Sequence, residues 1–188
     1  MYGPTESGVR RVDRTWYDSP PYTNNPNKNY TTSDNETSSL YDRARHAIAL
    51  GEGSHTYGKI LVSIHFDSGS GRNGPSIHLQ SPSTGSTQAQ YNISKSLGLA
   101  ICDRLWDTRF GTTSQCDQRI HNRNLAVLRE TTNTLNSGQP FPVVLIEVAD
   151  PSSSGDKTWL GTGSTLTSRL NSLGDAIAAG ILDFYNDH

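Results

Sequence analysis

The chain has 188 residues, a formal net charge of −2 and a hydrophobic fraction of 32%, which fits one compact domain, residues 1–188, with its own core. Its longest apolar run is far shorter than the roughly 18 residues that indicate a membrane span, and the N-terminus lacks a basic-then-apolar signal segment. No block of basic residues carries interleaved aromatics, so composition excludes a nucleic-acid-binding groove. We expect a monomer without a membrane span or a nucleic-acid partner.

The N-terminal part of the chain is polar, with short apolar stretches. Val9–Val12 predicts a strand, followed by a long loop rich in Asn, Thr and Ser. A helix is expected over Ser39–Leu50, where apolar residues recur at helical spacing and Gly51 stands at the stop position. The polar stretches Asn24–Ser39 and Pro151–Gly155 predict loops.

The remaining two thirds of the chain alternate between strand and helix patterns. The β-branched run Lys59–His65 predicts a strand buried on both faces, and Ser76–Leu79 a second, short strand. Gln88–Trp106 predicts an amphipathic helix, Phe141–Val148 a buried strand, and Leu166–Phe184 a final long helix. This alternation indicates an α/β fold, a single domain with a twisted, mainly parallel central sheet flanked by helices.

The two cysteines, Cys102 and Cys116, lie on either side of an aromatic stretch that ends in Gly111. We expect two free, partly buried thiols, and a disulfide instead if the chain folds back on itself. Cys102 falls on the apolar side of its predicted helix, and no histidine motif accompanies either thiol. Neither is therefore expected to take part in catalysis.

Two polar residues stand at the carboxyl ends of predicted strands, where open α/β sheets gather their ligands. His65 ends the first buried strand, and Glu147 is embedded in the apolar run Val143–Val148, where an ionised carboxylate is costly unless it is paired or lies near a metal. Structural alternatives exist for both residues. His65 would be a core histidine bonded to backbone, and Glu147 one half of a buried ion pair with Arg129.

Six segments of the chain occur in the order of a known set of motifs, and together they are more specific than any one of them. The segments are Val9–Arg14, Leu40–Arg43, Ser63–His65, Ser94–Ala100, Leu125–Arg129 and Val144–Glu147. In this order they resemble the zinc-dependent N-acetylmuramoyl-L-alanine amidases (amidase type 3), which cut bacterial peptidoglycan.

The resemblance implies a role for three residues. His65 would be a ligand of Zn²⁺, because neutral imidazole suits that ion. Glu147 would be the catalytic carboxylate beside the metal, taking a proton from water and passing it to the leaving amine. Arg129 would orient Glu147 or bind a charge on the substrate, with a structural salt bridge as an equally weighted alternative.

The chain also departs from the family's pattern. The family's Asp-Pro-Gly-His strand and the glutamate ligand on the next helix precede the segment that Val9–Arg14 resembles, and neither is present in these residues. One histidine does not hold catalytic zinc, which usually has three protein ligands. Residues that could complete the site, none at a family ligand position, are His46, Glu52, His55, Asp67 and His78. Val148–Ser152 replaces the family's Gly-Phe-Leu-Ser-Asn.

The predicted function is a peptidoglycan hydrolase, a zinc-dependent amidase cleaving the bond between N-acetylmuramic acid and L-alanine, in the cell envelope or secreted. We expect the chain to begin late relative to a full-length enzyme or to be degenerate, and to hold substoichiometric zinc. The alternative is a non-catalytic peptidoglycan-binding or regulatory module with an incomplete zinc site. A sugar-binding surface module has only the polar composition of the loops in its favour.

Overall fold

The computed structural model falls into two units, Met1–Asp42 and Arg43–His188, which are described separately. It describes residues 2–4, 10–12, 60–67, 69, 71–125, 128 and 142–187. In the first unit, strands β1 (Tyr2–Pro4) and β2 (Arg10–Val12) pair antiparallel, which confirms the strand expected at Val9–Val12. The helix expected at Ser39–Leu50 lies outside the described residues.

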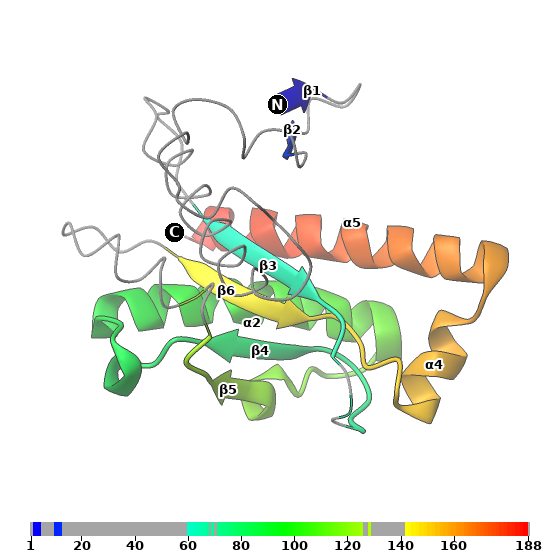
Figure 1. Cartoon of the computed structure of the whole chain (residues 1–188), viewed down its shortest axis with the longest axis horizontal. Coiled ribbons are helices and arrows are strands. Elements are labelled where there is room, and N and C mark those ends of the chain that lie inside the picture. The colour runs from blue at the N-terminus through cyan, green and yellow to red at the C-terminus, as the bar shows by residue number, and fades with distance from the viewer. Residues whose placement is uncertain are drawn as a thin grey trace, which may run out of the picture. The chain divides into compact units, whose positions relative to one another are not determined.

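The second unit contains a four-stranded sheet and three α-helices. Its elements are β3 (Leu61–His65), β4 (Ser76–Leu79), the 3-10 turn η3 (Pro82–Thr84), α2 (Gln88–Phe110), the 3-10 turn η4 (Cys116–Arg119), β5 (Ile120–Asn122), β6 (Val143–Glu147), α4 (Ser154–Leu160) and α5 (Gly163–Asp187) (Figure 1). No helix in these described ranges is long and apolar enough to cross a membrane.

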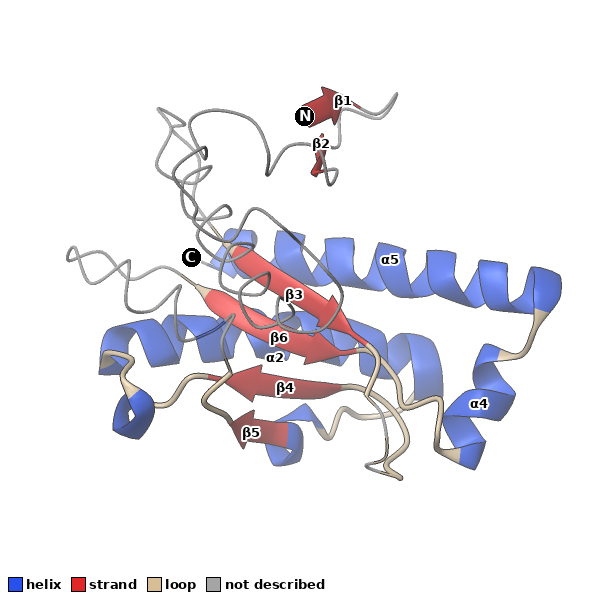
Figure 2. Cartoon of the chain, viewed as in Figure 1, coloured by secondary structure: helices blue, strands red, loops and turns tan. Residues whose placement is uncertain are grey.

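The sheet has the strand order β3-β6-β4-β5. β3 pairs with β6 in parallel and β4 with β5 in parallel, whereas the central pair β6 and β4 is antiparallel (Figure 2). The mixed, mostly parallel sheet with its helices confirms the predicted α/β class. The predicted strands and the two long helices are confirmed, with ends shifted by a few residues.

The prediction that the strand at Lys59–His65 is buried on both faces was wrong. In β3, the residues are half-buried or exposed, and Ile64 keeps 53% of its surface accessible. The physical reason is position, because β3 lies at an edge of the described sheet and is hydrogen-bonded there to β6. β6 occupies the interior of the sheet, and four of its five residues are buried.

One face of the sheet carries the main core. Side chains alternate along each strand, so Val144 and Ile146 of β6 share a face with Ile77 and Leu79 of β4, and all four pack in one cluster with α2 and α5. Figure 1 draws α2 behind the sheet. Gly98 of α2 permits this close approach, because a Cβ there would lie 2.7 Å from Ile77 Cγ2.

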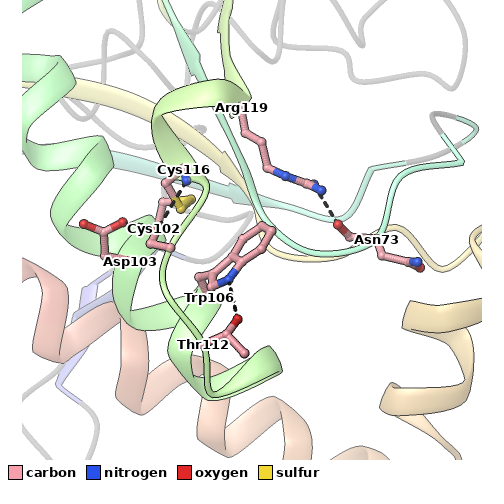
Figure 3. Close-up of a disulfide and its surroundings, with 8 residues drawn as sticks. Asn73, Cys102, Asp103, Trp106, Thr112, Cys116 and Arg119 are labelled. Carbon is pink, nitrogen blue, oxygen red and sulfur yellow. Dashed lines mark hydrogen bonds between the residues drawn. A yellow bond between two sulfur atoms is a disulfide. The ribbon is translucent and has the colours of Figure 1, made fainter.

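The cysteines form a disulfide, so the expectation of two free thiols was wrong. Cys102 of α2 and Cys116 of η4 are bonded, with Cα atoms 6.0 Å apart and both residues buried (Figure 3). The chain folds back because Gly111 adopts a left-handed conformation, φ 61°, at the end of α2. Arg119 then lies over the Trp106 ring, 4.8 Å from its centroid. The disulfide therefore links η4, the turn that precedes β5, covalently to α2.

The contact between α2 and α5 predicts opposite effects for two glycines of α5. A Cβ on Gly180 would lie 2.5 Å from the backbone Cα of Ile101, whereas a Cβ on Gly174 would meet nothing within 4 Å. Gly180→Ala should lower the free energy of unfolding by about 1–3 kcal/mol through overpacking. Gly174→Ala should leave it unchanged or raise it by up to about 1 kcal/mol through helix propensity. Urea denaturation measures the free energy of unfolding of both variants. Equal changes in the two variants would contradict the close packing of Gly180 against α2.

Candidate functional site

His65 and Glu147 are cross-strand partners at the carboxyl ends of β3 and β6. The parallel register pairs Ser63 with Leu145 and His65 with Glu147. Partners in register point to the same face of a sheet, so the two side chains lie next to each other on the face opposite the helical core. The expected placement of both residues at the carboxyl ends of strands is confirmed.

The face that carries this pair, called here the open face, continues across β4 and β5. Its row of residues follows from the registers: Ser63, His65, Leu145, Glu147, Ser76, His78 and His121. At the other end of the same face, Leu128 is buried against Val143 and Leu145. The open face is thus apolar where β6 begins and polar where β6 ends.

His65 is exposed, which argues against the alternative of a core histidine. Its Nε2 lies 2.9 Å from the Ser63 hydroxyl, two residues earlier on the same strand. A hydrogen bond to one ring nitrogen orients an imidazole and selects its tautomer, as is usual for metal-binding histidines.

Glu147 is half-buried, and its environment favours the protonated form. Burial, reinforced by the negative charges of Asp67 and Asp150, raises the pKa of Glu147 to about 7. Its Oε2 atom is buried and has no hydrogen-bond partner within the structure described. A carboxylate oxygen in that state is costly in a resting fold and typical of a functional site. The alternative partner, Arg129, lies outside the described residues.

Two more histidines lie on the open face, on β4 and β5. The rings of His78 of β4 and His121 of β5 have centroids 5.1 Å apart and planes tilted by 40°. His78 Nε2 lies 3.3 Å from the hydroxyl of Ser76. Burial, followed by the charges of His121 and Arg123, lowers the pKa of His78 to about 4. His78 is therefore neutral at physiological pH. Sequence reasoning missed His121, because a three-residue strand gives almost no periodic signal.

The loops that follow β3 and β6 are tied together beside the pair. Asp67 N donates to Ala149 O (2.9 Å), and Val148 N donates to His65 O (2.9 Å). Farther along, Gly71 N donates to Asp150 Oδ2 (2.9 Å). Asp150 is buried, so these contacts hold one of the negative charges that raise the pKa of Glu147.

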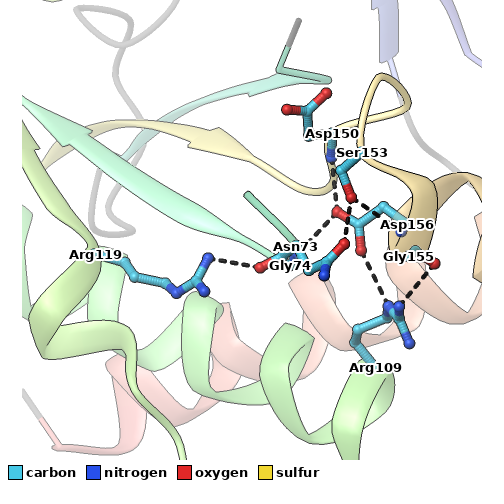
Figure 4. Close-up of polar contacts among 8 residues, drawn as sticks. All are labelled: Asn73, Gly74, Arg109, Arg119, Asp150, Ser153, Gly155 and Asp156. Atoms are coloured by element: carbon cyan, nitrogen blue, oxygen red, sulfur yellow. Dashed lines mark hydrogen bonds and ion pairs between the residues drawn. The ribbon is translucent and has the colours of Figure 1, made fainter. Parts of the chain in front are cut away.

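A fully buried carboxylate, Asp156 of α4, is the centre of this loop network. Its Oδ2 accepts from Gly74 N and from Asp150 N, both at 2.8 Å (Figure 4). Its Oδ1 accepts from Arg109 Nε of α2 at 3.1 Å, and Arg109 Nη2 also donates to Gly155 O at 3.0 Å. The helix α4 was not predicted, since Pro151–Gly155 gives a loop pattern. The sequence feature that could have indicated this helix is its N-cap residue Ser153, whose hydroxyl accepts a hydrogen bond from Asp156 N.

Comparison with protein families decides the identity of the fold. Residues 25–183 match the model of the N-acetylmuramoyl-L-alanine amidase family. The chain belongs to this family. No curated protein matches it by sequence.

Solved amidase structures share the fold. The CwlD amidase of Clostridioides difficile, in complex with the GerS lipoprotein, superimposes with a TM-score of 0.59 at 19% identity, covering 87% of this chain and 70% of that one. An N-acetylmuramyl-L-alanine amidase of Mycobacterium smegmatis gives 0.58 at 23% identity, covering 79% and 61%. An N-acetylmuramoyl-L-alanine amidase of Clostridium difficile 630 gives 0.54 at 19%, covering 78% and 65%. This chain thus spans between 61% and 70% of these amidases.

The described part of this amidase-family chain does not by itself fit a catalytic zinc site. It holds no group of three His, Cys, Asp or Glu side chains that could bind a metal, whereas catalytic zinc usually has three protein ligands. Asp67 and His78 therefore do not form a three-ligand group with His65 by themselves. The other candidates from the sequence, His46, Glu52 and His55, lie outside the described residues.

The raised pKa of Glu147 predicts a pH-dependent effect of Glu147→Gln on stability. Since the folded state disfavours the ionised carboxylate, the metal-free wild type should lose stability as pH rises from about 4.5 to about 7. The glutamine variant, without this charge, should be more stable at about pH 8 by about 1–2 kcal/mol, allowing for solvent screening, and no more stable at about pH 4. Thermal unfolding in chelator measures this. If the glutamine variant were more stable than the wild type by the same amount at both pH values, the raised pKa of Glu147 would not be the cause of the difference.

Asp156→Asn should destabilise the loop network strongly. The asparagine amide would point its NH₂ group either at the backbone N–H donors or at Arg109, and the charge of Arg109 would have no carboxylate partner. The free energy of unfolding should therefore fall by about 2–4 kcal/mol. Asp183→Asn is the matched control, since Asp183 forms an exposed ion pair with Arg104 at 2.5 Å and should change stability little. If urea denaturation gave the same loss of stability for Asp156→Asn and Asp183→Asn, the central role of Asp156 in the loop network would be contradicted.

Proposed function

We propose that the chain is a peptidoglycan hydrolase, a zinc-dependent amidase that cleaves the amide bond between N-acetylmuramic acid and L-alanine. Family membership over residues 25–183 supports the reaction class. The observation that carries the proposal is the cross-strand pair of His65 and Glu147 on the open face. Its partner is peptidoglycan, and its place of action the cell envelope or the outside of the cell.

Glu147 has the properties of a group that moves a proton during amide hydrolysis. With a pKa of about 7, it can accept a proton from the attacking water and return it to the leaving amine at neutral pH. Asp67 and Asp150 maintain this proton affinity, because their charges disfavour a further negative charge nearby. The loop network around Asp156 keeps Asp150 in that position.

His65 supplies one ligand in this proposal, and catalytic zinc usually has three protein ligands. Ser63 orients its ring. Bound zinc would supply an acidified water and polarise the scissile carbonyl. Arg129 is proposed to orient Glu147 or to bind a charge on the substrate.

The test is hydrolysis of purified peptidoglycan in the presence of zinc, followed by detection of newly exposed L-alanine amino groups. Glu147→Gln should reduce the rate about 10²- to 10⁴-fold, the usual contribution of a positioned general base. Arg104→Ala, in an exposed ion pair between α2 and α5, should leave the rate unchanged. A Glu147→Gln variant that keeps the wild-type rate would refute the assignment.

A non-catalytic peptidoglycan-binding module is the second candidate, favoured by one observation. The described residues lack a group of three metal-binding side chains. Binding to peptidoglycan without any release of L-alanine amino groups, even at saturating zinc, would establish this second function in place of the first.

A further inference from the structure

The turn η4 makes a contact with the segment between β3 and β4. Arg119, the last residue of η4, donates from Nη1 to the carbonyl oxygen of Asn73 at 2.6 Å (Figure 3). Its guanidinium group also lies over the Trp106 ring of α2. A hydrogen bond from a charged donor is stronger than one between neutral groups. Arg119 therefore ties residues 71–74, called here the 71–74 loop, to α2.

Asn73 is held from two sides. Its backbone carbonyl accepts from Arg119, and its side-chain Oδ1 accepts from the hydroxyl of Ser153, the N-cap of α4 (Figure 4). The next residue, Gly74, donates its N–H to Asp156 Oδ2 at 2.8 Å. The 71–74 loop is thus the junction between η4 on one side and the segment that follows β6 on the other.

The 71–74 loop reaches the candidate site through Asp150. Gly71 N donates to Asp150 Oδ2 at 2.9 Å, and Asp150 is a buried residue three positions after Glu147. Gly74 N and Asp150 N also share one acceptor, Asp156 Oδ2. If the loop loses its contact with η4, two of the hydrogen bonds that hold the segment after β6 are weakened.

The position of Arg119 depends on the disulfide. Cys116 is the first residue of η4, and it is bonded to Cys102 of α2 across a sequence separation of 14. Cys102 lies about one helical turn before Trp106, the ring that Arg119 covers. The bond therefore holds the turn that carries Arg119 against the helix that carries the ring. Without it, the segment that returns from Gly111 to η4 has more freedom to leave α2.

We propose that the Cys102–Cys116 disulfide and Arg119 form a redox-dependent positioning device, which orders the 71–74 loop beside the candidate site only in the oxidised protein. Arg119 is a positioning residue, because it acts on the site through Asn73. Formation of the bond removes two electrons and two protons from the two thiols. A disulfide oxidant such as oxidised glutathione takes them up and is cleaved to two thiols.

Burial of the two cysteines means that the device is set once, when the protein matures. Cys102 has 0% and Cys116 1% of its surface exposed, so a reductant reaches the bond only when the fold opens. Thiols stay reduced in a reducing compartment and pair in an oxidising one. On the amidase function proposed above, on which this consequence rests, a hydrolase made in the first compartment acquires its ordered loop in the second.

Hydrogen exchange of the backbone amides, measured on the full chain in chelator, tests the device. The amides of Gly71 and Gly74 report on the 71–74 loop, because both donate hydrogen bonds there. The double variant Cys102→Ala/Cys116→Ala should lower protection at both amides about tenfold or more and lower Tm by about 6–12 °C. Refolding in dithiothreitol should have the same effects on the wild type and none on the double variant. Unchanged protection at Gly71 and Gly74 in the double variant would overturn the proposal.

Arg119→Ala separates the action of Arg119 from a general loss of stability, because this variant keeps the disulfide. Protection at Gly74 should again fall about tenfold. Arg119→Lys, which can still donate to Asn73 O, should retain most of the protection. Arg123→Ala is the matched control, since it removes an exposed arginine four residues farther along the chain, and it should leave the exchange unchanged. Equal protection at Gly74 in Arg119→Ala and Arg123→Ala would contradict the role of Arg119.

Hydrolysis of peptidoglycan in the presence of zinc keeps this proposal apart from the amidase function. With both correct, the oxidised wild type should cleave about tenfold faster than the cysteine double variant, at a temperature where both are folded. Equal rates, with protection at Gly71 and Gly74 lost in the variant, would refute the effect of the device on the site. If neither protein cleaves while the variant loses this protection, the amidase function is refuted and the ordering of the loop by the disulfide is supported.

Discussion

The parallel pairing of β3 with β6 is the constraint on which the site depends. Burial of Val144 and Ile146 against α2 and α5 fixes which face of β6 is turned to the core. In β-structure, a slip of one residue would exchange the two faces, so burial of this apolar set also sets the register. The register then places His65 and Glu147 side by side on the open face. The chemistry of the site thus follows from the packing of the opposite face.

The loops around the pair are held by a buried charge as well as by the apolar packing of Val148 and Ala149. Asp156, with 0% of its surface exposed, joins the segment after β3, the segment after β6 and the helix α2 through Gly74, Asp150 and Arg109. The segment Val148–Ser152 contributes Asp150 to this arrangement. This segment therefore has a structural role, and it also places a negative charge that acts on Glu147.

The sequence predicted those parts of the fold that dense apolar patterns specify. β3 and β6 were recognised from short, dense apolar runs, and α2 and α5 from apolar residues recurring at about 3.6 residues. β5 was not recognised, since three residues are too short for a period, and with it His121 was missed. The Cys102–Cys116 disulfide depends on the fold-back at Gly111, which is a tertiary feature. The position of the His65 and Glu147 pair was predicted correctly, whereas zinc and the role of Arg129 remain predictions.

Zinc titration monitored by NMR of the histidine side chains tests the account most directly, because it identifies the ligand whatever the affinity. The account predicts that the ring signals of His65 change as zinc is added, while those of His78 and His121 keep their positions. In Glu147→Gln, the same His65 signals should still respond, since the proposed ligand is the imidazole of His65. Zinc that binds through other residues while the His65 signals stay unchanged would contradict the assignment of this strand end as the metal-binding side of the site.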